Sequence, residues 1–264
     1  MKKAEFLTQE VTIPRELRSI TINNTGNLFE DSTTTISSRP AVRNNKPKSG
    51  QKEFGIASAM AKTLRSSLSP GMSAICESYV SGRLTAQFRN LAMQEDGELG
   101  QRPMCPSKHG HLLNGFEFNT TSPYDEIFGA KYFVKSGSRR GQVILHFPAF
   151  IPEKTFKKPK GATNFKINAR LVAISDYHFD QGTKEYLPLD KACHGKYGSY
   201  ESAMLPLLKI PTEPMTGQVS VENVQKMTEN SGLFLVMAVS FYHYENGKFN
   251  HLSKESGMQI RRVL

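Results

Sequence analysis

The chain has 264 residues, of which 38% are hydrophobic and 22% charged, and its formal net charge at pH 7 is +10. Leu, Ile, Val and Phe make up about 23% of the residues, above the level of roughly 20% below which chains tend to stay disordered. The longest apolar run, Leu233–Val239, is far shorter than the ~20 residues that a membrane-spanning helix needs. We therefore expect a folded protein that neither spans nor binds a membrane.

The cysteines and the N-terminal residues indicate the cellular compartment of the protein. Cys76, Cys105 and Cys193 are odd in number and widely spaced, which does not suit a disulfide framework. No apolar stretch follows Lys2 and Lys3 as it would in a secretory signal. We expect free thiols and a cytoplasmic location.

Residues 1–47 are predicted to form an N-terminal arm or small β-ribbon. Ser19–Asn23 alternates apolar and polar side chains, as a half-buried strand does. Asn23–Gly26 favours a turn, and the β-branched residues of Thr33–Ser37 suit a return strand. Because a two-stranded ribbon is marginally stable alone, the arm is expected to pack on its own domain or on another subunit.

Residues 48–110 are predicted to be a helical segment. An amphipathic stripe comprises Phe54, Ala57, Ala61, Leu64 and Leu68. Ser69-Pro70 has the residue types of an N-cap followed by proline at the first helical position, which predicts the start of a second helix. Its expected apolar positions are Met72, Ile75, Tyr79, Leu84, Phe88 and Leu91. The pattern predicts a helical hairpin.

Residues 111–264 change to a period of two, typical of strands. In Phe165–Leu171 the apolar side chains alternate with Lys166, Asn168 and Arg170, which are expected on the opposite face. Asn246-Gly247 suits a type I′ turn and predicts a hairpin around it. Further strands are expected around Phe116 and Phe118 and over 131–135, 142–147 and 258–263. Strands without intervening helices predict an antiparallel β-sandwich, so the fold class expected for the chain is α+β.

The net charge is concentrated in two blocks. Residues 39–65 carry seven basic side chains against Glu53 alone, and residues 131–170 carry ten against Glu153 alone. Such blocks can neutralise a polyanion, but they also occur as solvated linkers and as lysine-protected sheet edges. The candidate polyanion-binding residues are Arg39, Arg43, Lys46, Lys48, Lys52, Arg139, Arg140, Lys157, Lys158, Lys160, Lys166 and Arg170.

Aromatic side chains gather around the last predicted hairpin. They are Phe241, Tyr242, Tyr244 and Phe249. One interpretation is a core face with an aromatic rim, and the other is a protein interface, where Tyr and Phe are enriched.

No catalytic or metal-binding constellation is complete in the sequence. Cys105, His109 and His111 offer ligand types for zinc, but no further cluster supplies the four ligands of a structural site. Cys193-His194 places thiol and base next to each other, an arrangement that seldom gives productive geometry. We therefore predict no catalytic residues, no metal and no cofactor, and a protein that is not an enzyme.

Several short motifs follow one another along the chain. They are Arg43–Lys48, Glu53-Phe54-Gly55, Ala57–Arg65, Glu98–Arg102, Leu113–Asn119, Gly161–Ile167 and Leu233–Tyr244. Their order resembles a family of bacterial proteins of unknown function, over roughly residues 18–260. The resemblance implies an N-terminal ribbon, a helical segment and a β-rich C-terminal half, without catalytic residues. The Thr- and Ser-rich stretch Ser32–Ser38 departs from the aromatic ribbon that the resemblance implies.

These features together predict a non-enzymatic structural or interaction subunit of a homo-oligomeric or larger assembly. The predicted arm suits pairing with a neighbouring subunit's sheet edge. The alternative is a polyanion- or nucleic-acid-binding protein that uses the basic blocks 39–65 and 131–170.

Overall fold

The computed structural model describes residues 49–222, 224 and 227–264. These lie in a compact unit that spans Lys46–Leu264 and includes both the helical segment and the strands. The predicted arm and the basic residues Arg39, Arg43, Lys46 and Lys48 fall outside the described residues.

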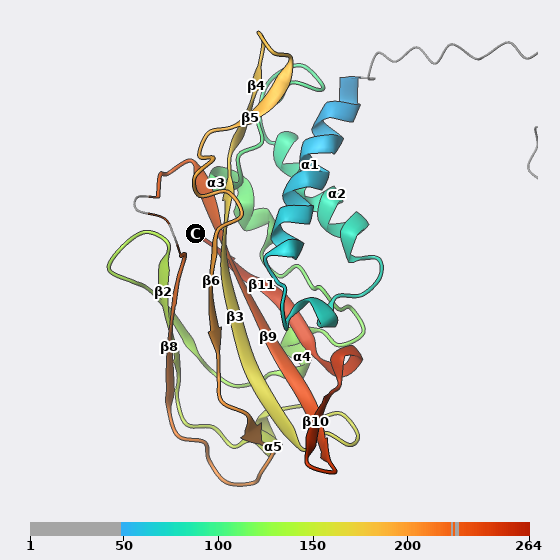
Figure 1. Ribbon diagram of the computed structural model, residues 1–264, viewed down its shortest axis with the longest axis vertical. Coiled ribbons are helices and arrows are strands. Elements are labelled where there is room, and N and C mark those ends of the chain that lie inside the picture. Colours follow the sequence, from blue (N-terminus) through green and yellow to red (C-terminus); the bar gives the residue numbers. More distant parts are fainter. Residues whose placement is uncertain (1–48, 223, 225–226) are drawn as a thin grey trace, which may run out of the picture. The chain divides into compact units, whose positions relative to one another are not determined.

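The unit has three layers (Figure 1). The middle layer is a six-stranded antiparallel sheet of β3 (Asn164–Ser175), β6 (Tyr197–Glu201), β7 (Leu205–Pro206), β9 (Ser231–Glu245), β10 (Lys248–His251) and β11 (Gly257–Val263). On one face lie the helices α1 (Ser49–Ser66) and α2 (Val80–Ala92). On the other lies a three-stranded sheet of β1 (Phe133–Ser136), β2 (Gln142–Phe147) and β8 (Met215–Ser220).

Short elements complete the connections. They are η1 (Ser73–Ile75), α3 (Pro106–His109), η2 (Gly110–Leu113), α4 (Tyr124–Ile127), α5 (Pro152–Thr155), the hairpin of β4 (Tyr177–Asp180) with β5 (Glu185–Pro188), and η3 (Ser253–Glu255). The α+β class and the β-rich C-terminal half are confirmed. No helix among the described residues has the length and apolar character to cross a lipid bilayer.

The central pair β3–β9 separates two hydrophobic cores. On β3, Val172 and Ile174 face the core beneath the helices. The intervening Leu171 and Ala173 face the core between the sheets, because successive side chains of a strand point to opposite faces. The two sheets thus form a sandwich, as predicted, and the helices cover its outer face.

The helical hairpin is present, but its second helix begins later than predicted. Ala57, Ala61, Leu64 and Leu68 are buried as expected, whereas Phe54 is exposed. Ser69-Pro70 lies in a turn and not at a helix start. Gly71 follows at φ +95°, a conformation that a right-handed helix cannot contain, and α2 starts only at Val80.

Most strand predictions are confirmed, with one exception. The predicted hairpins correspond to β1–β2 and β9–β10, and the predicted closing strand is β11. The segment around Phe116 and Phe118 is not a regular strand. Its backbone follows the outer edge of β11, with Gly115 N donating to Ile260 O at 2.8 Å and Phe118 N to Met258 O at 2.8 Å.

The two sheets approach each other most closely where β6 meets β8. A Cβ atom at Gly198 would lie 2.0 Å from the Ser220 carbonyl oxygen, so only glycine allows this backbone contact. Glu222 N then donates to Tyr197 O at 3.2 Å. This junction covers the outer edge of β6.

A buried ion pair ties α1 to the loop after α2. Glu53 is fully buried and accepts hydrogen bonds from Gly100 N at 2.8 Å, Arg102 Nε at 2.9 Å and Arg102 Nη2 at 2.7 Å. Burial alone would raise the pKa of Glu53, but the hydrogen bonds and the charge of Arg102 outweigh it and hold the pKa below its usual value. The carboxylate is therefore charged and fully hydrogen-bonded.

We predict that Arg102→Met lowers the free energy of unfolding by about 3–5 kcal/mol, because it leaves a buried carboxylate without its partner. Urea denaturation measures the change. The matched control is Lys157→Met, which removes an exposed pair with Glu126 and should cost at most about 1 kcal/mol. Equal losses in the two variants would contradict the structural role of the buried pair.

Candidate functional site

The β9–β10 hairpin presents an exposed aromatic pair. Phe249 lies directly opposite Tyr244 in the antiparallel register, and the two ring centroids are 4.7 Å apart. Tyr244 is 49% exposed and Phe249 46% exposed. A second cross-strand stack joins Tyr242 and His251, with centroids 5.0 Å apart. Such cross-strand pairs stabilise a hairpin, yet about half of the surface of Tyr244 and Phe249 remains open to solvent.

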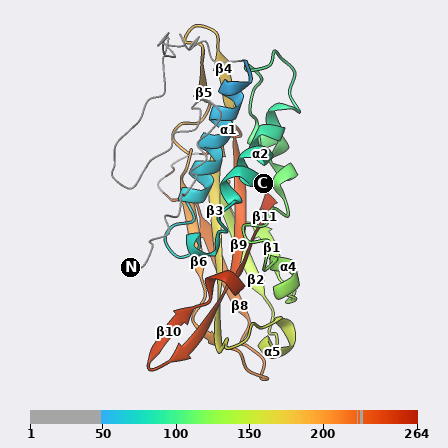
Figure 2. The ribbon, with the colours of Figure 1, turned by 90° about the vertical axis from the view of Figure 1, so that its right-hand side faces the viewer.

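The helix layer ends before this hairpin. On β9 the side chains of Phe234, Val236 and Ala238 pack against the helical core. Tyr242 and Tyr244 continue along the same face, because they follow at intervals of two. In Figures 1 and 2 the β10 end of the sheet extends beyond α1 and α2. The aromatic side chains therefore lie on a sheet face that these helices leave uncovered.

Phe241 does not belong to this surface. Its side chain is fully buried and points between the two sheets, where its ring lies 5.6 Å from that of Phe156. Its prediction as an interface residue is wrong, because the alternation of β9 places it on the opposite face from Tyr242. The candidate interface thus comprises Tyr242, Tyr244 and Phe249, which we call the aromatic surface.

The hairpin is held in place by the loop before β3. Tyr244 N donates to Thr163 Oγ1 at 2.8 Å, and the His243 Nδ1–H donates to Gly161 O at 2.6 Å. These bonds continue the contact between the two chain segments beyond Asn164 and Tyr242, the last residue pair of the antiparallel β3–β9 ladder. They fix the orientation of the aromatic surface.

The second basic block is divided between distant places. Arg139 and Arg140 precede β2, while Lys157, Lys158 and Lys160 follow it, so they lie near opposite ends of that strand (Figure 1). Arg140 donates to Thr228 O at 3.0 Å and Ser231 O at 2.6 Å. Arg139 and Arg140 are therefore separated from Lys157, Lys158 and Lys160 by the length of β2.

Several of the candidate cations are also paired with acidic or other groups. Lys157 lies 3.6 Å from Glu126, Lys158 lies 3.9 Å from Glu153, and Lys166 pairs with Glu201. Lys52 donates to Lys184 O at 2.6 Å, with its Nζ 5.0 Å from the Phe179 ring centroid. Arg170, a candidate polyanion-binding residue, is 91% buried. The cationic surface available to a polyanion is smaller than the sequence indicates.

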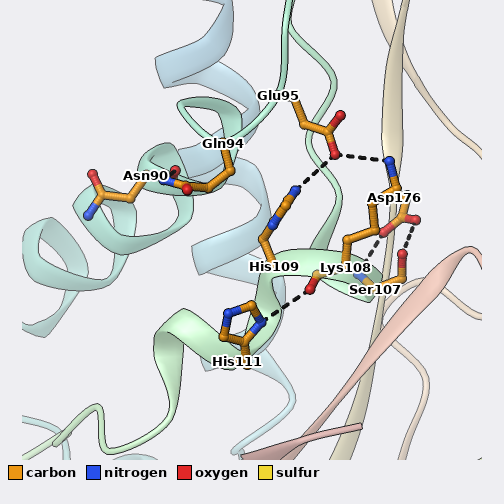
Figure 3. A network of polar contacts seen from close by, with 8 residues as sticks. All are labelled: Asn90, Gln94, Glu95, Ser107, Lys108, His109, His111 and Asp176. Atoms are coloured by element: carbon orange, nitrogen blue, oxygen red, sulfur yellow. Dashed lines mark hydrogen bonds and ion pairs between the residues drawn. The ribbon is translucent and has the colours of Figure 1, made fainter.

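The Cys105–His111 segment forms a polar network and not a strand (Figure 3). Glu95 Oε1 accepts hydrogen bonds from Lys108 Nζ at 3.1 Å and His109 Nε2 at 3.0 Å. The His111 ring points away from Glu95, and its Nδ1–H donates to Lys108 O at 3.1 Å. The two histidines therefore do not converge. No group of three or more His, Cys, Asp or Glu residues among those described could hold a metal ion.

Asp176 anchors the start of α3 in the same network. It accepts hydrogen bonds from the backbone N–H of Ser107 at 2.9 Å and from the Ser107 hydroxyl. Burial, together with the nearby carboxylates Asp176 and Glu95, raises the pKa of the Cys105 thiol to about 12. Sequence reasoning missed Glu95 and Asp176, because they lie far apart in the chain and no local spacing links them. The network joins the loop after α2, the helix α3 and the link between β3 and β4.

Cys193 and His194 face different partners. The Cys193 thiol donates to Asp190 Oδ2 at 2.9 Å, and burial together with this carboxylate raises the thiol pKa to about 11. His194 Nδ1 accepts from the Ser175 N–H at 3.2 Å, so the neutral ring carries its proton on Nε2, 3.2 Å from Thr63 Oγ1. The thiol is protonated at neutral pH, and its hydrogen-bond partner is the Asp190 carboxylate and not the His194 ring.

No protein-family model, curated protein or solved structure matches this chain.

We predict that the stability of the protein falls as the pH drops below about 6.5, the usual histidine value. Burial lowers the pKa of His194 in the folded state, so the unfolded chain binds a proton that the fold excludes. A His194→Gln variant should show a flatter dependence of the unfolding free energy on pH between 7 and 5. Denaturation at several pH values measures it, and identical slopes would contradict the assignment.

Proposed function

We propose that the protein is a non-enzymatic interaction subunit of a homo-oligomeric assembly and that the aromatic surface forms part of its subunit contact. The observation that carries this proposal is the pair Tyr244–Phe249, about half exposed on a sheet face beyond the helix layer. Aromatic side chains are enriched at protein interfaces, where a few of them supply most of the binding energy.

The edge of the sheet beside the aromatic surface supports the same proposal. Within the described part of the chain, β10 pairs only with β9, so the backbone groups along its other side are available. An open edge of this kind accepts a strand from another chain. We propose that residues 1–47, predicted from the sequence to be an extended arm, add to this edge in a neighbouring subunit.

The state of the cysteines bears on both the non-enzymatic character and the compartment. Cys76, Cys105 and Cys193 are free thiols. Their raised pKa values, about 11 for Cys76 and Cys193 and about 12 for Cys105, leave little thiolate at neutral pH, and the thiolate is the reactive form. Three unpaired thiols suit a reducing compartment, so we place the protein in the cytoplasm.

The alternative, binding of a nucleic acid or another polyanion through residues 39–65 and 131–170, has weaker support. Among the described candidates, Lys157, Lys158 and Lys166 each pair with a carboxylate. A polyanion groove needs cations that line one continuous path, and β2 separates the two halves of the second block. We therefore rank this alternative second.

We predict that the double variant Tyr244→Ser/Phe249→Ser weakens self-association about 30-fold or more, since interface hot spots cost 2 kcal/mol or more. Size-exclusion chromatography with light scattering over a range of concentrations measures the change. The matched control is Tyr79→Ser, because Tyr79 is 80% exposed and stands at the N-terminus of α2, outside the β9–β10 hairpin. A wild-type protein that is monomeric at all concentrations would refute the proposal.

We predict that deletion of residues 1–47 leaves a folded but monomeric protein. The compact unit from Lys46 onward contains both hydrophobic cores, so its folding should not depend on the removed residues. Circular dichroism checks the fold and light scattering checks the mass. A truncated protein that retains the oligomeric mass of the full chain would show that the arm makes no essential contact.

A further inference from the structure

Arg170 is a buried cation with little compensation from the protein. It lies on β3, on the sheet face that the helices cover, and is 9% exposed. Its Nη2 donates to Pro70 O at 2.9 Å, and its guanidinium carbon lies 4.8 Å from the Tyr197 ring centroid. No described carboxylate forms an ion pair with it, and this hydrogen bond uses one of the five N–H donors. Buried charges are normally paired or fully hydrogen-bonded.

The guanidinium group stands at a small recess, which we call the Arg170 recess. Its volume is about 70 Å³. Its lining includes Asn168 and Arg170 on the inner wall and Pro70, Gly71, Ser199 and Glu201 at the rim. The inner wall is buried and the rim is exposed, so the recess is reachable from solvent. Arg170 Nη2 donates to Pro70 O at the rim, so the guanidinium group itself lies at the recess.

The size of the recess suits a small polyatomic ligand. A water molecule occupies about 30 Å³ in the liquid, so the recess has room for more than one water. A ligand group with a central atom and four oxygens is therefore of suitable size. A long or bulky side chain would not fit within it.

The charges around the recess favour an anion. Lys166 and Arg170 lie on the same strand face as Glu201, and Glu201 pairs with Lys166. Among the lining residues Arg170 is the cation and Glu201 the carboxylate, and Lys166, which lies outside the lining, offsets the charge of Glu201. Ser199 lies directly opposite Arg170 in the β3–β6 register, at the exposed rim, and adds a hydroxyl donor. A guanidinium group presents parallel donors that match an oxyanion in a bidentate way.

We propose that the Arg170 recess binds an oxyanion of phosphate size, with Arg170 as the main donor and Ser199 at the entrance. The ligand is either inorganic phosphate or the terminal phosphate of a phosphomonoester. This inference does not depend on the proposed subunit contact, because none of the recess residues belongs to the aromatic surface.

The test is thermal unfolding of the full-length protein at pH 7 with sodium phosphate, phosphoserine or sodium chloride at matched ionic strength. At a tenfold excess over its dissociation constant a ligand raises the folding equilibrium constant about elevenfold, a rise in Tm of roughly 3–5 °C. We expect a saturable rise with phosphate, with phosphoserine or with both, and none with chloride. A rise with phosphoserine alone would identify the ligand as a phosphomonoester.

Two variants test whether the rise in Tm comes from binding at the Arg170 recess. Arg170→Gln removes the main donor and should abolish the rise in Tm. Ser199→Asp places a carboxylate opposite Arg170 at an exposed position and should weaken phosphate binding at least tenfold. This variant still tests the proposal if Arg170→Gln does not fold. Ser136→Asp is the matched control, because Ser136 is an exposed strand residue on β1.

Two results would overturn the proposal. The first is the absence of a saturable rise with either phosphate compound in the wild-type protein, which would mean that the recess holds water only. The second is a rise of the same size in Ser199→Asp as in Ser136→Asp, which would place phosphate binding elsewhere on the surface.

Discussion

The pairing of β3 with β9 is the interaction on which the rest of the structure depends. It runs in one antiparallel register from Asn164 opposite Tyr242 to Ser175 opposite Ser231. Both strands are buried on both faces over most of this length. One face receives the helices and the other the second sheet. A slip of one residue would exchange the two sets of side chains, so neither core can form without this register.

The same register sets where the candidate sites lie. Along the helix-facing side of β3, the side chains change from Val172 and Ile174 beneath the helices to Arg170 and then Lys166. On β9 the same face ends in the aromatic surface. On β9 the helices cover Phe234, Val236 and Ala238 and leave the end of the strand beside β10 uncovered. The Arg170 recess and the aromatic surface thus share one face of the sheet.

The sequence predicted those features that depend on local pattern. Asn246-Gly247 located the β9–β10 turn, and the alternation in Phe165–Leu171 assigned the faces of β3 correctly. Alternation shows which side chains share a face but not what covers that face. Arg170 was therefore assigned to the correct face, but no local pattern showed that its guanidinium group donates to Pro70 O, 100 residues earlier. The Glu53–Arg102 pair was missed for the same reason, since its members are 49 residues apart.

The formal charge of +10 has a different meaning once the contacts are known. Lys157, Lys158 and Lys166 each lie beside a carboxylate, and Lys158 shares Glu153 with Lys209. Such exposed pairs contribute little to stability. Arg170 differs from them in its neighbours. It lies opposite Val236 of β9, and the next residue on the same face of β3 is Val172. An aliphatic side chain at position 170 would pack between these two without the cost of burying a charge. The proposed oxyanion would add partners for the guanidinium group to the two that the protein supplies, Pro70 O and the Tyr197 ring.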